Sequence, residues 1–183
     1  PHMILLTGDY LNRLEAADDL VAFLRELRAP YGVYAVPGNW DWKFPVRECF
    51  ARAGVRLLAD ETATVGEGLE IVGLDVRPKR RVPELASSRA PFRILLHHKP
   101  DAVDELAGLP PEARVDLFLC GHTHGGQVCL PLYGAIATLS KYHKKYESGW
   151  YVAHGTRTYV NRGIGTEAAL PVRFLARPEV ALI

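Results

Sequence analysis

Short apolar runs separated by amphipathic segments constrain the fold of this chain more than any other feature. The runs ILL (4–6), VYAV (33–36) and RILL (93–96) are short and continuous, which is typical of buried strands. Between the first two runs, residues 12–27 carry leucine, valine and alanine at helical spacing. This β-α-β alternation, followed by a C-terminal part rich in short strands, predicts one α/β domain with a mixed sheet system.

The boundaries of further elements follow from turn residues. We expect the helix at 12–27 to begin with a capping box of Asn12 and Glu15 and to end before Pro30. A hairpin is predicted at 63–76, with its turn at Gly66–Gly68. The remaining predictions are helices at 46–54 and 101–109 and strands at 55–58, 117–120, 127–131, 149–154, 157–163, 172–176 and 179–183.

Length and composition exclude several classes of protein. A chain of 183 residues fits a single domain over 1–183, in which Pro1 and His2 are interpreted as a tag remnant. The net charge of +1 gives no overall field that favours nucleic acid. No apolar stretch approaches the ~20 residues of a membrane span. The three cysteines lack Cys-x-x-Cys spacing, so we expect reduced thiols and a cytoplasmic protein.

Residues of metal-binding type follow four of the apolar runs. Asp9 and Asn39 come after the first two runs, His98 ends the strand at 93–96, and His122 and His124 follow the strand at 117–120. In α/β sheets the carboxyl ends of the strands are where ligands gather. Carboxylate, amide and imidazole donors together suit divalent transition metals such as Mn²⁺, Fe²⁺, Zn²⁺ or Co²⁺. The alternative for the loop GHTHGG (121–126) is a glycine-rich turn with two surface histidines.

Two basic runs, 77–81 and 141–146, are interpreted as solvated surface, with contact to an anionic substrate as the alternative.

Four motifs in a fixed order resemble the calcineurin-like metallophosphoesterases. They are TGD (7–9), GNWD (38–41), HH (97–98) and GHTHGG (121–126), and the tail at 159–183 looks like the bacterial phosphodiesterase branch. The resemblance implies a four-layer α/β/β/α sandwich of two mixed sheets flanked by helices, here shortened at its N-terminus. It also implies metal-dependent hydrolysis of phosphodiester or phosphomonoester bonds by an activated water molecule.

The resemblance implies a role in the metal site for individual residues. Asp9 matches the carboxylate that bridges two metal ions, and Asn39, His98 and His122 match the other ligands of the second metal. His124 matches a ligand of the first metal. Mn²⁺ is the expected ion, with Fe²⁺, Zn²⁺, Co²⁺ or Ni²⁺ as alternatives. Asp9 and Asn39 are also predicted to be catalytic, because they would hold the reacting groups.

The chain departs from the family pattern at two points. The family's Asp-x-His motif, which should precede Asp9, is absent, so the first metal keeps only Asp9 and His124 and should bind weakly. Trp40 stands where the family has the histidine that protonates the leaving group, and Asp41 loses the partner that it orients there. Asp41 and His97 are kept as predicted catalytic residues, with a surface or supporting role as the alternative for His97.

Two classes of function stay open on this reasoning. The first is a phosphoesterase that acts on a small phosphate ester of unknown identity. The second is a non-catalytic or impaired metal-binding scaffold with the same fold. Without an upstream strand beside it, the segment ILL (4–6) should form an exposed sheet edge, through which we expect a homodimer.

Overall fold

The computed structural model describes residues 1–77, 85, 87–167 and 169–183. The α-helices are α1 (Ala17–Glu26) and α2 (Val46–Ala53). The strands are β1 (Ile4–Leu6), β2 (Val33–Ala35), β3 (Arg56–Leu57), β4 (Glu61–Val65), β5 (Leu69–Gly73), β6 (Phe92–Leu96), β7 (Leu117–Cys120), β8 (Cys129–Leu130), β9 (Gly134–Ala135), β10 (Gly149–Ala153) and β11 (Thr156–Val160). Short 3-10 segments are η1 (Leu14–Ala16), η2 (Asp41–Lys43), η4 (Pro100–Leu106), η5 (Pro111–Ala113), η6 (His124–Gly126) and η7 (His143–Tyr146).

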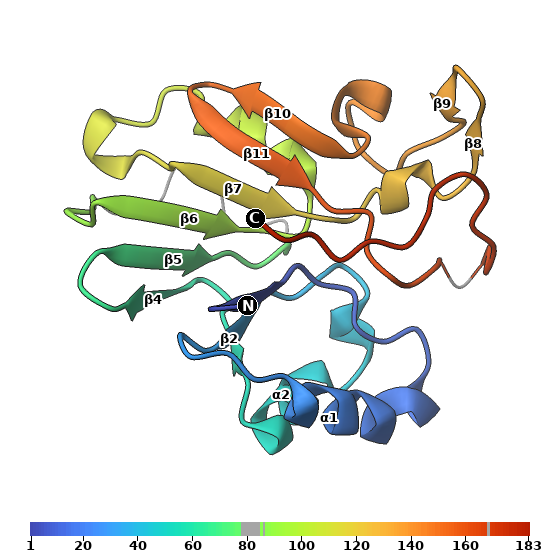
Figure 1. The fold of residues 1–183 in the computed structure, drawn as a ribbon, viewed down its shortest axis with the longest axis horizontal. Coiled ribbons are helices and arrows are strands. Elements are labelled where there is room, and N and C mark those ends of the chain that lie inside the picture. The colour runs from blue at the N-terminus through green and yellow to red at the C-terminus, as the bar shows by residue number, and fades with distance from the viewer. Residues whose placement is uncertain (78–84, 86, 168) are drawn as a thin grey trace.

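The strands form two main sheets and one small hairpin (Figure 1). The first main sheet is parallel, with the order β1-β2-β3. The second has the order β10-β11-β7-β6-β5-β4, in which β11, β7, β6 and β5 run parallel and the outer strands β10 and β4 are antiparallel. The hairpin consists of β8 and β9.

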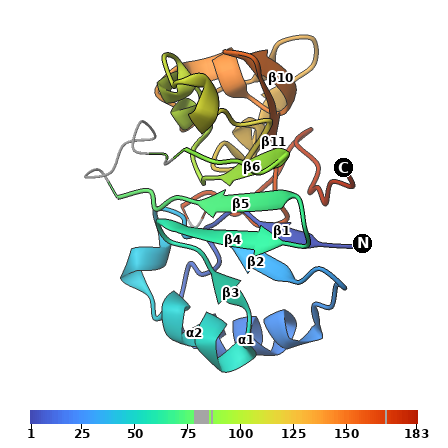
Figure 2. The ribbon, with the colours of Figure 1, turned by 90° about the vertical axis from the view of Figure 1, so that its left-hand side faces the viewer.

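The two main sheets pack face to face, and α1 and α2 cover the outer side of the smaller one (Figure 2). Leucine, isoleucine and valine from both sheets fill the space between them, among them Leu58, Ile71 and Leu96. On the helical side, Leu24 of α1 and Phe50 of α2 pack in the cluster that contains Ala35 of β2. The predicted class, mixed α/β with two main sheets, is therefore confirmed.

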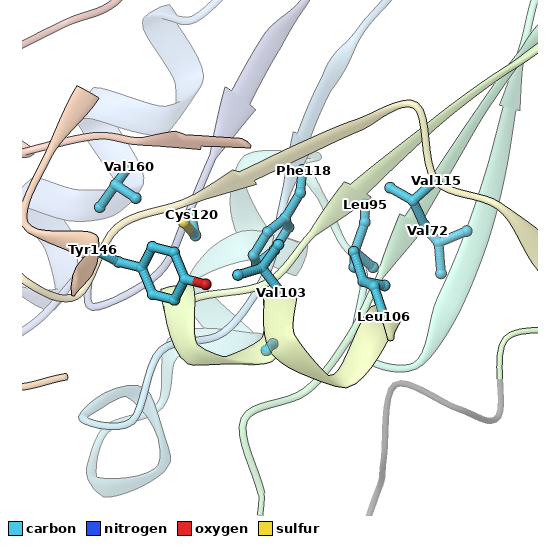
Figure 3. Packing of buried hydrophobic residues seen from close by; sticks show 10 residues of the cluster. Val72, Leu95, Val103, Leu106, Val115, Phe118, Cys120, Tyr146 and Val160 are labelled. Carbon is cyan, nitrogen blue, oxygen red and sulfur yellow. The ribbon is translucent and has the colours of Figure 1, made fainter. Parts of the chain in front are cut away.

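The outer face of the larger sheet is covered differently from the prediction. Leu95 and Phe118 of this face pack against Val103 and Leu106 of η4 and against Tyr146 (Figure 3). The predicted α-helix at 101–109 is thus a 3-10 segment of 7 residues, which begins at a proline and is followed by Gly108 with φ 86°. The helical fourth layer of the predicted sandwich is therefore not confirmed.

Several other element predictions are confirmed. The strand at 33–36, the hairpin at 63–76 and the strands at 117–120 and 149–154 correspond to β2, β4–β5, β7 and β10. The helix at 46–54 corresponds to α2, which ends at Gly54 with φ 71°, a left-handed conformation that glycine adopts without strain.

Other predictions are wrong at the ends of elements. The capping box is not formed, because the η1 turn precedes α1 and neither N-cap residue, Arg13 or Ala16, caps with its side chain. The predicted strands at 172–176 and 179–183 are not strands, and only isolated bridges join Val128 to Phe174 and Leu175. These C-terminal residues instead cross the surface near β8, where no long strand offers a ladder of partners.

Among the residues that the structure describes, no helix combines the length and apolar character that a membrane span requires. The three cysteines are free and buried. Within the basic run at 77–81, all residues except Arg77 lie outside the described residues.

Candidate metal centre

The fold brings the ends of four strands to one edge of the molecule. Asp9 follows β1, Asn39 follows β2, and His98 follows β6. His122 and His124 follow β7, which runs parallel to β6 (Figure 1). The two sheets stack so that the loops after β1 and β2 meet the loops after β6 and β7, as the contact between Asp9 and His98 shows. The structure therefore brings Asp9 and His98, two of the residues predicted for this edge, into contact.

Two glycines allow these loops to approach so closely. A β-carbon added at Gly38 would lie 2.1 Å from Oδ1 of Asp9. A β-carbon at Gly8, which has φ 100°, would lie 2.6 Å from Nδ1 of His98. Real β-carbons do not tolerate such distances, so any side chain at either position would push the loops apart. Asp9 itself has φ 61°, a conformation that the surrounding contacts must hold.

Asp41 holds the loops after β1 and β2 together. Its Oδ2 accepts hydrogen bonds from the backbone N–H groups of Asp9 (2.8 Å) and Gly38 (2.6 Å), and its Oδ1 accepts one from Tyr10 (2.8 Å). Burial raises the pKa of Asp41, and these three hydrogen bonds offset only part of that effect. The structure thus gives Asp41 a contact with the backbone of Asp9, and its predicted catalytic role stays a prediction.

Three side chains form a compact cluster of possible metal ligands. Nε2 of His98 lies 3.0 Å from Oδ2 of Asp9, and Nδ1 of His122 lies 3.1 Å from the same Nε2. One ligand atom from each of the three residues lies within 4.8 Å of the others. His98 and His122 are both buried. The cluster therefore offers one carboxylate and two imidazoles at a site largely shielded from water.

Hydrogen bonds to backbone carbonyls decide which ring nitrogen faces the cluster. Nδ1 of His98 lies 2.7 Å from the carbonyl oxygen of Thr7, which can only accept, so Nδ1 carries a hydrogen. Nε2 of His122 likewise donates to the carbonyl oxygen of Leu139 at 3.1 Å. When both rings are neutral, as metal binding requires, the two remaining nitrogens present lone pairs toward the Asp9 carboxylate. Three acceptors that face one another need a positive centre between them, which a proton or a metal cation supplies.

The protonation states of Asp9 and His122 favour the binding of a cation. Burial opposes ionisation of Asp9, but the hydrogen bond and charge of His98, together with the N–H group of Trp40, hold the pKa of Asp9 below its usual value. Burial, followed by repulsion from His98, lowers the pKa of His122 to about 4. At neutral pH the cluster therefore contains an ionised carboxylate and a neutral His122, which are the forms that bind metals.

Two further predicted ligands are buried without a hydrogen-bond partner among the described residues. They are the Oδ1 atom of Asn39 and the Nδ1 atom of His124. Burial, followed by the charge of Arg173, lowers the pKa of His124. A buried polar atom without a partner is costly in a folded protein, and it is expected where a ligand completes the site. Both atoms therefore fit the role of metal donors.

His97 and Trp40 lie beside this centre but outside the cluster. Nδ1 of His97 is 3.0 Å from the carbonyl oxygen of Lys99, and burial lowers the pKa of His97 to about 4. The backbone N–H of Trp40 donates to Oδ1 of Asp9 at 2.9 Å, and Nζ of Lys43 lies 3.5 Å above the Trp40 ring. The structure brings neither side chain into the group of three, so a catalytic role for His97 stays a prediction.

The C-terminal segment supports the loop after β7, which sequence reasoning missed. Arg173 donates to the carbonyl oxygens of His124 (3.0 Å) and Arg162 (2.7 Å), and also to those of Gly165 and Ala176. His124 has φ 52°, so this contact holds a residue in an unfavourable backbone conformation. No pattern around Arg173 marks it in the sequence, because its partners are backbone carbonyls, and that of His124 lies 49 residues away along the chain.

Comparisons with known proteins agree with this arrangement. The profile of the calcineurin-like phosphoesterase family matches residues 1–126. An uncharacterised metallophosphoesterase of Bacillus subtilis, YkuE, is 36% identical, with 100% of this chain and 67% of the relative covered. The phosphodiesterase YaeI of Escherichia coli is 31% identical, with 100% and 70% covered.

A more distant relative carries a more specific name. The UDP-2,3-diacylglucosamine pyrophosphatase LpxG of Chlamydia trachomatis is 25% identical, with 100% of this chain and 73% of the relative covered. No solved structure matches the chain. The family profile and the bacterial relatives confirm the resemblance seen in the four motifs. The chain belongs to the calcineurin-like phosphoesterase family.

Proposed function

We propose that this chain binds divalent transition metal ions and hydrolyses phosphodiester bonds. The observation that carries the proposal is the convergence of Asp9, His98 and His122, whose facing atoms are all acceptors once the histidines are neutral. Family membership supports hydrolysis of phosphate esters, and the name of the relative YaeI supports phosphodiesters within that class.

The donors define the ions that fit. Asp9, Asn39, His98 and His122 would hold the well-bound ion, and Asp9 with His124 would hold a second, weaker one. Carboxylate, amide and imidazole ligands suit divalent transition metals. Among these ions we propose Mn²⁺, with Fe²⁺, Zn²⁺, Co²⁺ and Ni²⁺ as alternatives. Such an ion, when bound, lowers the pKa of a water molecule and neutralises charge on a phosphoryl group.

The chain's own residues orient the metal ligands. Asp41 acts as a positioning residue, because its carboxylate accepts hydrogen bonds from the backbone N–H groups of Asp9 and Gly38. These bonds join the two loops that carry Asp9 and Gly38. The backbone N–H of Trp40 further orients the Asp9 carboxylate. The Trp40 ring has an N–H group without useful acidity, so it does not protonate a leaving group. We propose His97 as the candidate substitute, and the relative rates on aryl and alkyl phosphodiesters test whether it donates a proton.

The alternative is a metal-binding scaffold without turnover. Trp40 favours it, because the position that should deliver a proton holds a residue that cannot do so. The buried free cysteines favour a reducing compartment, so the proposal places either version in the cytoplasm.

The experiment that tests the proposal combines binding with turnover. Mn²⁺ binding is measured by calorimetry and hydrolysis with bis(p-nitrophenyl) phosphate, for the wild type, His98→Ala and the control His143→Ala, which changes an exposed histidine in η7. We expect binding and hydrolysis in the wild type and the control, and neither in His98→Ala. Full Mn²⁺ binding by His98→Ala would contradict the proposal. Binding without hydrolysis in the wild type would favour the scaffold.

We also propose self-association through β1. The N–H of Ile4 donates to Gly32 (3.2 Å), and the carbonyl of Leu6 accepts from Val36 (3.0 Å), so both residues face β2. By alternation, Leu5 directs its backbone groups toward the opposite edge, beyond which the sheet has no further strand in the described chain. Light scattering should show a dimer that Leu5→Pro dissociates. A wild type that is monomeric at high concentration would contradict this.

A further inference from the structure

The carbonyl group of Leu139 decides how His122 faces the candidate metal centre. Its oxygen accepts the hydrogen of His122 Nε2 at 3.1 Å, which leaves Nδ1 of His122 directed toward Nε2 of His98. Leu139 lies between β9 and η7, outside any helix or strand, and it is 55% exposed. Regular structure and side-chain burial therefore do not hold this carbonyl in place, and other contacts must do so.

Asp101 anchors the residues that directly follow Leu139. Its Oδ1 accepts a hydrogen bond from the hydroxyl of Ser140 at 2.5 Å, and its Oδ2 accepts one from the backbone N–H of Lys141 at 3.0 Å. The Ser140 hydroxyl in turn accepts a hydrogen bond from the N–H of Tyr142 at 3.1 Å, and Ser140 is buried. A carboxylate bonded to two successive residues fixes the direction of the turn, and with it the carbonyl that precedes Ser140.

The position of Asp101 is itself fixed by the fold. Asp101 is the second residue of η4, in which its neighbours Pro100 and Ala102 are buried. Ala102 and Val103 pack in the cluster that covers the outer face of the larger sheet (Figure 3). Because η4 begins two residues after His98, the end of β6 carries both a candidate metal ligand and this anchor.

These contacts form a closed path between the two histidines of the cluster. The chain leads from His98 to Asp101, and hydrogen bonds lead from Asp101 through Ser140 to the segment of Leu139. The carbonyl of Leu139 binds His122, whose Nδ1 lies 3.1 Å from Nε2 of His98. A change at Asp101 should therefore affect His122, although the hydrogen bonds of Asp101 in this path involve neither ring.

We propose that Asp101 is a positioning residue of the metal centre, which sets the tautomer of His122 through Ser140 and the Leu139 carbonyl. The inference rests on the proposed function, and it names the residue that prepares His122 as a ligand. When the carbonyl is displaced, Nε2 of His122 loses its acceptor, and the ring hydrogen can move to Nδ1. A protonated Nδ1 has no lone pair for a metal ion.

The test reads the tautomer of His122 in the metal-free protein near neutral pH, by long-range ¹H–¹⁵N correlation spectra. In the wild type we expect one form, with the hydrogen on Nε2. In Asp101→Ala and in Ser140→Ala we expect a mixture that includes the form with the hydrogen on Nδ1. Calorimetry should show that these variants bind Mn²⁺ about 10- to 100-fold more weakly. Asp101→Asn keeps one acceptor oxygen and should lie between the two.

Asp104→Ala is the matched control. Asp104 also lies in η4 and accepts hydrogen bonds from Lys145 (2.9 Å) and Tyr146 (2.8 Å) of η7. It thus joins the same two elements, but these bonds do not include Ser140 or Lys141. We expect Asp104→Ala to keep the wild-type tautomer of His122 and the wild-type affinity for Mn²⁺.

The outcomes separate this inference from the proposed function. A single Nε2–H tautomer of His122 in Asp101→Ala or in Ser140→Ala would overturn the inference, as would an equal change in Asp104→Ala. Ser140→Ala removes only a hydroxyl group, so it decides the matter if Asp101→Ala does not fold. If the wild type binds no Mn²⁺, the proposed function fails, and the tautomers of the metal-free proteins still show whether Asp101 positions His122.

Discussion

The candidate centre has two parts, which differ in the hydrogen bonds that their side chains make. His98 contacts Asp9 at 3.0 Å and His122 at 3.1 Å, and the carbonyls of Thr7 and Leu139 orient the two histidine rings. Asn39 and His124 instead have buried atoms with no hydrogen-bond partner among the described residues. We refer to these as the connected part and the unpartnered part of the centre.

The difference shows how much of a metal site a fold can prepare in advance. In the connected part, the backbone fixes the tautomer and orientation of each ring, so a cation replaces a proton with little rearrangement. In the unpartnered part, buried polar atoms without hydrogen bonds lower the stability of the fold, and a bound ligand would remove this destabilisation. We expect strong binding at the connected part, where Asn39 supplies a further ligand, and weaker binding at Asp9 with His124.

The largest expected effect tests whether the centre contains a proton donor. With Trp40 in place of an acid, alkyl phosphodiesters lose help worth about 10²–10⁴-fold, while aryl esters with good leaving groups need little. We expect rates on p-nitrophenyl esters to exceed those on matched dialkyl esters by at least this additional factor. Equal rates would reveal a proton donor in place of Trp40, with His97 as the first candidate.

A second prediction compares the metal content of one variant in the connected part with that of one variant in the unpartnered part. His122→Ala removes a donor from the connected part, and we expect its affinity for Mn²⁺ to fall by more than about a hundredfold. His124→Ala should keep the strong site and lose only the weak one. Metal analysis after dialysis, together with calorimetry, measures both. A His122→Ala protein that retains its full metal content would show that the strong site lies elsewhere.

The smallest predicted effect concerns the support of the unpartnered part. Arg173→Met removes the hydrogen bond to the carbonyl of His124, which has φ 52°, and we expect faster hydrogen exchange at Gly126 and Gln127 by about tenfold. Arg157→Met, on an exposed position of β11, is the control. Unchanged exchange at Gly126 and Gln127 in Arg173→Met would show that the loop is held by its own turn.

The sequence predicted the strand core of the fold well and its covering layers less well. Runs such as those in β2, β6 and β7 are apolar and bounded by turn residues, so their length and burial decide their structure locally. The segment at 101–109 has helical spacing, but a proline at its start and a glycine near its end limit it to a 3-10 segment. The residues after 170 alternate like strands, yet strand formation needs a partner that the fold does not provide.

The candidate site was predictable where a residue type and its place after a strand coincide. This applies to Asp9, His98 and His122, which the structure brings together, since parallel strands bring their ends to one edge. The role of Arg173 was not predictable, because it depends on carbonyl groups that become neighbours only in the folded chain. The contact of Asp41 with the backbone of Asp9 was hidden for the same reason.

The most direct test of the account is to identify the ring nitrogens that bind metal. Long-range ¹H–¹⁵N correlation spectra of the ¹⁵N-labelled protein, recorded during titration with Zn²⁺, distinguish Nδ1 from Nε2 in each histidine. We predict that Zn²⁺ binds Nε2 of His98 and Nδ1 of His122, because Nδ1 of His98 donates to Thr7 and Nε2 of His122 donates to Leu139. Binding through the opposite nitrogens, or unchanged resonances of both histidines, would contradict it.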